Sequence, residues 1–248
     1  MRIFKNISYS SFDECTLDIY LPEEKEFSLF VYFHGGGLDH GDKSGAEIFA
    51  KFLTDRNIAV VSANYRLYPQ AQYPDFIKDA AAVVDWASKN ISEYGNCEKI
   101  YIGGSSAGAY ISMLLQFDKK YLDMYNIDTE KIGGFIHDAG QPTTHFNVLK
   151  ERGIDGRRII VDDAAPLYYV GLAQDYAPML IIVSDNDMEN RIEQLSLLVS
   201  TLKHFRYDEN KVELKIMHGK HTAYVKEIDC DGNSVFGKLV AEFINKQA

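Results

Sequence analysis

The sequence predicts an α/β fold in which helices cover both faces of a mostly parallel central sheet. Short apolar runs rich in β-branched and aromatic residues alternate with longer segments of helical periodicity, the pattern of βαβ units. Several of these runs are apolar almost throughout, as expected of strands covered on both faces. A chain of 248 residues can form one substantial core, so we expect a single domain over residues 1–248.

The chain opens with two runs that we expect to form an antiparallel pair, residues 3–9 and 16–21, and Pro22 ends the second because it cannot donate to a ladder. Proline also marks the start of a helix at Pro74, where the first turn tolerates it. The other strands are expected at residues 27–33, 58–63, 99–103, 133–138, 179–184 and 212–217. The other helices are expected at residues 46–57, 107–115, 192–202 and 235–244.

Composition excludes several classes of protein. The formal net charge of −10 disfavours a nucleic-acid partner, and no apolar run is long enough to span a bilayer. The N-terminus is followed by polar residues rather than by the apolar stretch of a secretory signal. Cys15, Cys97 and Cys230 are widely spaced and odd in number, which suits a reducing compartment. We therefore expect a cytoplasmic protein that binds neither nucleic acid nor membrane.

A candidate nucleophile lies between a predicted strand and a predicted helix. Gly104-Ser105-Ser106-Ala107-Gly108 fits the pattern G-x-S-x-G, in which a sharp turn raises the serine hydroxyl above the sheet. Bulky neighbours would clash in such a turn, which explains glycine at both flanking positions. Choosing Ser105 instead would lose the second glycine, so the pattern favours Ser106 as the nucleophile of an acyl-transfer reaction.

A second glycine-rich segment, His34-Gly35-Gly36-Gly37, follows the strand predicted at residues 27–33. Acyl transfer passes through a tetrahedral oxyanion, and glycines allow backbone N–H groups to approach that oxygen closely. On its own the segment could be an ordinary turn. Paired with a nucleophile turn, it indicates an oxyanion hole.

At these two motifs the chain resembles the α/β-hydrolase superfamily, and within it the HGGG carboxylesterases of the hormone-sensitive-lipase-like and acetyl-esterase type. The resemblance extends to Asn64-Tyr65-Arg66-Leu67-Tyr68-Pro69, then to Tyr73-Pro74 and Asp79-Ala80. It implies that the N–H groups of Gly36, Gly37 and Ala107 form the oxyanion hole. Many HGGG esterases have a long N-terminal cap, whereas 33 residues precede His34 here, so we expect little or no cap from that end.

Residues 141–177 form the weakest part of the resemblance. They mix helical patches with a turn at residues 153–156 and stand between two predicted core strands. We interpret them as a helical excursion over the active-site face, a candidate for a small lid-like insertion.

The other triad members should follow the serine in the order acid, then histidine. Asp187 and His221 each come just after a predicted strand, where the catalytic groups of such sheets converge. Asp185 and Glu189 compete for the acid, and His218 competes for the base. The family resemblance favours Asp187 and, through Gly219-Lys220-His221, the histidine at 221.

The remaining histidines lack the spacing of metal ligands: His40, His137, His145 and His204. His34 is expected to organise its loop. We expect no metal and no cofactor. The sequence thus predicts a serine carboxylesterase that hydrolyses short-chain acyl esters, such as acetyl esters, through an acyl-enzyme. The alternatives are an amidase or arylformamidase with the same triad, or a non-catalytic small-molecule-binding protein. The oligomeric state stays open.

Overall fold

The computed structural model describes residues 1–129, 132–173 and 175–247, and its framework is one eight-stranded sheet in the order β1-β2-β4-β3-β5-β6-β7-β8. Strand β2 runs antiparallel to its neighbours β1 and β4, and the other neighbouring pairs are parallel. The predicted sheet is therefore confirmed. The strands are β1 (Arg2–Ser8), β2 (Thr16–Leu21), β3 (Glu26–Phe33), β4 (Ile58–Ala63), β5 (Asn96–Ser105), β6 (Gly134–Asp138), β7 (Met179–Asn186) and β8 (Val212–Lys220).

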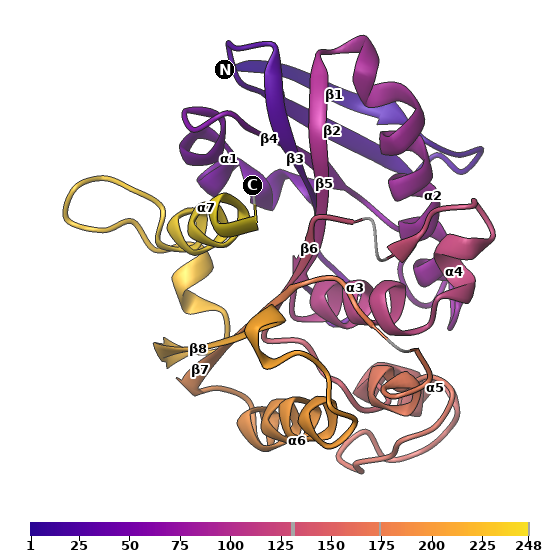
Figure 1. Cartoon of the computed structure of the whole chain (residues 1–248). Helices are drawn as coiled ribbons and strands as arrows, with labels where there is room; N and C mark the ends of the chain where they lie inside the picture. The colour runs from indigo at the N-terminus through magenta and orange to yellow at the C-terminus, as the bar shows by residue number, and fades with distance from the viewer. Residues whose placement is uncertain (130–131, 174, 248) are drawn as a thin grey trace.

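Helices cover both faces of the sheet (Figure 1). Helices α1 (Glu47–Thr54) and α7 (Val235–Gln247) pack on one face over a buried cluster that includes Phe49 and Phe236. The opposite face carries α2 (Asp75–Asn90), α3 (Ala107–Phe117) and α6 (Arg191–His204) over a larger cluster. Shorter helical segments are η1 (Lys43–Ala46), η2 (Ile91–Glu93), α4 (Lys120–Asp123), α5 (Phe146–Glu151), η4 (Pro166–Tyr169), η5 (Glu209–Lys211) and η6 (Ala223–Val225).

The strands at the centre of the sheet are buried along their length because helices cover both of their faces. Every residue of β4 and of β6 is buried, whereas the edge strand β8 alternates between half-buried and exposed positions. On α2 the six positions predicted to face the core are all buried: Phe76, Ile77, Ala80, Val83, Val84 and Ala87. Apolar periodicity therefore placed these core elements correctly.

Element ends differ from the prediction where the apolar pattern stops before the backbone pairing does. Strands β7 and β8 continue to Asn186 and Lys220, which pair with each other beyond the apolar runs. Asp185 therefore lies within β7 rather than after it. Pro74 precedes α2 as its N-cap residue, and the first predicted helix begins with the 3-10 turn η1 and ends at Thr54. Among the described residues, no helix has the length and apolarity needed to cross a membrane.

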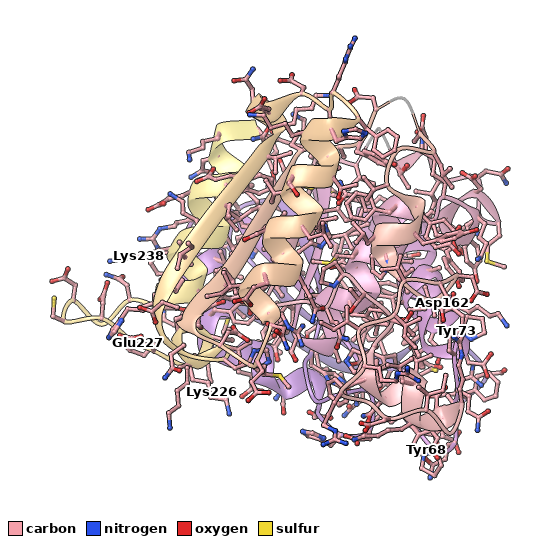
Figure 2. The ribbon with its side chains drawn as sticks, turned by 90° about the horizontal axis from the view of Figure 1, so that it is seen from below. Tyr68, Tyr73, Asp162, Lys226, Glu227 and Lys238 are labelled. Atoms are coloured by element: carbon pink, nitrogen blue, oxygen red, sulfur yellow. The ribbon has the colours of Figure 1, made fainter. Side chains whose placement is uncertain are left out.

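The segment 141–177 contributes the helical pieces α5 and η4; its residue 174, like residues 130, 131 and 248, lies outside the described residues. It is attached to the rest of the fold at several points. Tyr110 of α3 donates to Ala164 O at 2.6 Å, and the backbone N–H of Tyr73 donates to Glu151 at 3.1 Å. In Figure 2, Tyr73 and Asp162 lie close together, far from Lys226 and Glu227, which follow β8. The segment is therefore packed against α3 and the start of α2.

Candidate active site

Three side chains that follow different strands meet at the carboxyl ends of the sheet. The hydroxyl Oγ of Ser106, after β5, lies 2.9 Å from Nε2 of His221, which follows β8. Nδ1 of the same imidazole lies 2.6 Å from Oδ1 of Asp187, after β7. A serine, a histidine and a carboxylate are thus joined in one hydrogen-bonded chain, the arrangement that activates a nucleophile.

The carboxylate at the end of this chain is held in its ionised form. The Asp187 side chain is fully buried, and it accepts hydrogen bonds from the backbone N–H groups of Ser184 at 3.2 Å and Met188 at 2.7 Å. Burial by itself would raise the pKa of Asp187, but the bonds from His221 and these N–H groups lower it below its ordinary value. An ionised carboxylate at this position can orient the imidazole through its bond to Nδ1.

The turn that presents Ser106 is strained and needs both of its glycines. Ser106 has φ 54° and ψ −112°, and its backbone N–H donates to Asp138 O at 2.7 Å. A Cβ added to Gly108 would lie 2.0 Å from the carbonyl oxygen of Phe33, and one added to Gly104 would lie 2.5 Å from Gly108. Strand β5, the start of α3 and the end of β3 therefore approach too closely for any other residue.

The predicted oxyanion loop lies beside this turn. Gly36 has φ 123° and Gly37 has φ 62°, and a Cβ on Gly36 would lie 2.0 Å from His40 O. Both glycines line the same cavity as Ser106. Ala107 is the first residue of α3, so its N–H has no acceptor within the helix.

Side chains from two other segments hold the predicted oxyanion loop in place. His34 stacks on Tyr65 at 4.6 Å, and the Tyr65 hydroxyl donates to His34 O at 2.9 Å. The Nδ2 group of Asn147, on α5, donates to Gly37 O and, at 3.1 Å, to Asp39. His34 is thus a loop organiser, as predicted. No pattern in the sequence singled out Asn147, because its role depends on how residues 141–177 fold back onto the loop.

A cavity of about 610 Å³ opens above the serine. Ser106, His221 and the glycine loop form one side of it. Its larger apolar side chains are Tyr32, Phe146, Met188 and Val225. A small molecule with a carbonyl group can therefore reach the hydroxyl of Ser106 from solvent.

The rival residues form a pair of their own. Nδ1 of His218 lies 2.7 Å from Oδ2 of Asp185, and the His218 side chain is 97% exposed. Hydrogen bonding to Asp185 raises the pKa of His218. Glu189 is exposed and lines a neighbouring cavity. The structure thus brings Asp187 and His221, and neither rival, to Ser106.

The sequence did not predict the buried polar network that lies under the serine. The Tyr224 hydroxyl donates to the carboxylate of Asp138, the last residue of β6, and Tyr32 donates to Ser105 Oγ at 3.1 Å. Burial raises the pKa of Asp138 to about 6, partly offset by contacts with Ser105 and Tyr224. Asp138 looked in the sequence like the polar end of a strand, so only its tertiary surroundings reveal it.

The other buried histidines have structural contacts. His137 lies 2.8 Å from Ser112 Oγ and 2.6 Å from Gln116 Oε1, and His145 accepts from the N–H of Asn147 at the start of α5. Across the described part of the chain, no three His, Cys, Asp or Glu side chains are grouped as a metal site would require.

Sequence comparisons identify similar proteins over part of the chain. The BD-FAE family model matches residues 17–143, just over half of the chain. A probable isoprenylcysteine alpha-carbonyl methylesterase of Arabidopsis thaliana is 31% identical over 48% of this chain and 29% of its own length. Probable carboxylesterase 1 of the same plant is 31% identical over 54% and 48%, and an acetyl esterase of Salmonella schwarzengrund is 32% identical over 41% and 32%. These alignments span less than half of each relative.

Solved structures match over nearly the whole chain. Esterase B of Lactobacillus rhamnosis superposes with a TM-score of 0.80 at 17% identity, covering 99% of this chain and 86% of that one. A carbohydrate esterase from gut microbiota gives 0.77 at 17% identity, covering 100% and 96%. At this level of identity the likeness establishes the fold, which is that of an α/β-hydrolase.

Proposed function

The chain belongs to the BD-FAE family, and from this premise we propose that it is a serine carboxylesterase that hydrolyses short-chain acyl esters through an acyl-enzyme intermediate. One observation carries the proposal: the hydrogen-bonded chain from Ser106 through His221 to the buried Asp187. The names of the relatives support the ester bond as the target, since they include a carboxylesterase, a methylesterase and an acetyl esterase.

In the proposed reaction, Ser106 Oγ attacks the ester carbonyl carbon while its proton passes to Nε2 of His221. The tetrahedral intermediate collapses when the bond to the leaving oxygen breaks, and Nε2 gives its proton to that oxygen to release the alcohol. Water then attacks the acyl-enzyme, with His221 again taking a proton and returning it to Ser106. Asp187 keeps the imidazole in the required tautomer throughout.

The N–H groups of Gly36, Gly37 and Ala107 are the proposed donors to the oxyanion. Two features support this role: the open, left-handed glycine turn beside Ser106, and the position of Ala107 at the N-terminus of α3. A helix N-terminus favours the negative charge that develops on the carbonyl oxygen. Loss of a single such donor costs an acyl-transfer enzyme about 100- to 1,000-fold in kcat.

The preference for short acyl groups is supported by what lies beneath the serine. Asp138 and Tyr224, buried and hydrogen-bonded to each other, fill the space under Ser106, and Tyr32 donates to Ser105 where both line the cavity, so a long alkyl chain would have to displace hydrogen-bonded side chains there. The acetyl esterase among the relatives agrees with a small acyl group.

The test is hydrolysis of p-nitrophenyl acetate, butyrate and octanoate by the wild-type protein and by Ser106→Ala. Ser44→Ala is the matched control, because Ser44 lines the same cavity but is exposed and outside the triad. We expect rates that fall with acyl length, a loss of at least about 1,000-fold in Ser106→Ala, and no change in Ser44→Ala. Normal activity in Ser106→Ala would refute the nucleophile. A preference for octanoate would refute the short acyl group, and hydrolysis of acetanilides alone would favour an amidase.

A further inference from the structure

We propose that a second cavity, beside the catalytic one, is a subsite for a carboxylate carried by the substrate, with Arg191 as its anion-binding residue. The natural ester would then be acidic rather than neutral. This inference rests on the proposed esterase function for the reaction itself.

The second cavity has a volume of about 590 Å³ and lies between α5 and the start of α6. It shares Phe146 and Met188 with the cavity above Ser106. Met188 follows Asp187 directly, and its flexible side chain forms part of the partition between the two spaces. A substrate whose ester group lies at Ser106 can therefore extend past these two side chains.

Arg191 lines the second cavity and is 4% exposed. Its Nη1 donates to Ala139 O at 2.8 Å, and Nη2 lies 3.8 Å from the sulfur of Met188. Its Nε–H has no hydrogen-bond partner among the described residues. A guanidinium has five N–H donors, and burying one without a carboxylate is costly.

The same chain shows how a structural arginine is paired. Nε and Nη2 of Arg66 each donate to a different oxygen of Asp79 at 2.8 Å, which satisfies the guanidinium with one buried carboxylate. No such ion pair is found for Arg191 among the described residues. Burial lowers the pKa of Arg191 to about 10, partly offset by the charge of Asp187, so its own charge persists at neutral pH.

Other groups around the cavity also favour an anion. Arg191 is the first residue of α6, a helix of 14 residues, and Asn190 before it provides no side-chain cap. The N–H of Arg191 itself donates to Met188 O, so the helix favours an anion here only through the positive end of its dipole. Lys150, Arg157 and Arg158 also line the cavity, against Asp155 and Glu189, and Asp155 is paired with Arg157. Cations thus outnumber acids here, although the whole chain carries −10.

A simpler role for Arg191 is to brace the left-handed residue Ala139 through its carbonyl oxygen. That role needs one N–H of the guanidinium and no contact with substrate. It predicts that removing the cation harms stability and affects acidic and neutral esters equally. The subsite predicts a loss confined to acidic esters, so paired substrates separate the two roles.

The experiment compares p-nitrophenyl hydrogen glutarate with p-nitrophenyl valerate, and 4-acetoxyphenylacetate with its methyl ester, to place the acid on the acyl or the alcohol side. In one pair we expect kcat/KM to favour the acidic ester by about tenfold to hundredfold, as charge-assisted hydrogen bonds allow. Arg191→Met should abolish that preference while retaining activity on the neutral ester. No preference in either pair, or a preference that survives Arg191→Met, would overturn the subsite.

Arg191→Met also removes the hydrogen bond to Ala139 O and could fail to fold for that reason, so a second variant tests the subsite independently. Gln194→Glu changes a residue lining the same cavity to its acidic isostere and should reduce the preference for the acidic ester. Arg206→Met, an exposed arginine outside the cavity, is the matched control and should leave the preference unchanged. A full preference in Gln194→Glu would count against the subsite.

A binding assay separates failure of the subsite from failure of the esterase proposal. Titration of glutarate into Ser106→Ala, followed by calorimetry, should show binding that Arg191→Met removes, whether or not any ester is hydrolysed. Glutarate binding without esterase activity would retain the subsite and refute the reaction. Esterase activity without glutarate binding or acid preference would do the reverse.

Discussion

The buried carboxylate of Asp138 should make the stability of this protein depend on pH in a way that Asp138→Asn removes. Asp138 is fully buried under the serine turn, and Tyr224 is its hydroxyl donor. Burial raises its pKa from 3.8 to about 6. Asparagine keeps the acceptor for Tyr224 and the shape of the side chain but cannot ionise.

The direction in which stability changes with pH follows from proton binding. Because the pKa of Asp138 is higher in the folded than in the unfolded chain, the folded state binds the extra proton, and the resulting stability is fully present below about pH 4. It is lost as the pH rises through about 6. The difference between 3.8 and about 6 corresponds to about 3 kcal/mol of unfolding free energy.

The assay is urea denaturation of the wild-type protein and Asp138→Asn at half-unit steps from pH 4 to 8, at constant ionic strength. Carboxylates that do not interact with Asp138 contribute equally to both proteins, so the difference between the two unfolding free energies isolates Asp138 together with its charge interactions with His221 and Asp187. That difference should shift by about 3 kcal/mol in favour of Asp138→Asn between pH 4 and 8. Tyr224→Phe, which removes the donor to the charged form, should move the transition to higher pH. A difference that does not vary with pH would refute the raised pKa.

Three further outcomes are expected. Asp187→Asn should lower kcat on p-nitrophenyl acetate by about 10,000-fold with its circular dichroism unchanged, because the imidazole tautomer is no longer fixed; a loss under tenfold would contradict its role. His218→Ala should change kcat by less than about twofold and the unfolding free energy by less than about 0.5 kcal/mol, since its pair is exposed; a large loss of kcat would restore it as a candidate base. Gly108→Ala should destabilise the fold by about 3 kcal/mol or more, because its Cβ would lie 2.0 Å from Phe33 O. The control Gly45→Ala, whose Cβ would have nothing within 4 Å, should leave the melting temperature unchanged. Equal melting temperatures for the two variants would contradict the clash.

Much of the fold was predictable because the core imposes its periodicity on the sequence. The strands at residues 58–63 and 16–21 were predicted to the residue, since burial on both faces or a turn residue such as Pro22 sets their ends. Boundaries failed where pairing continues without apolar side chains, as at Asn186 and Lys220. Residues 141–177 lack a regular period because they fold into short helical pieces and loops rather than into a strand or a long helix.

The sequence also predicted Ser106, Asp187 and His221, because glycine-rich turns and the ends of strands can be recognised from local sequence. Asp138, Asn147 and Arg191 cannot be recognised in this way. Their roles depend on which atoms surround them after folding: Tyr224 beside Asp138, Gly37 O beside Asn147, and a cavity beside Arg191. Tertiary surroundings decide the pKa and the hydrogen bonds of a polar side chain, so residue type and spacing alone could not identify these three.

The two Asp–His pairs show where a local signal was available but depended on a boundary. Asp185 and His218 are 33 residues apart in the sequence, and Asp187 and His221 are 34 apart. Each histidine contacts its own aspartate. Along β8 the even-numbered positions from 214 to 220 are exposed, which places His218 on the outer face by strand alternation. When the strand is predicted to end at residue 217, His218 falls in the following loop and its direction is not defined. When the strand continues to Lys220, alternation points His218 away from Ser106. Gly219, with φ 122°, and the loop after Lys220 then leave His221 free to turn toward Ser106. The length of the edge strand thus determines which of the two Asp–His pairs can reach Ser106.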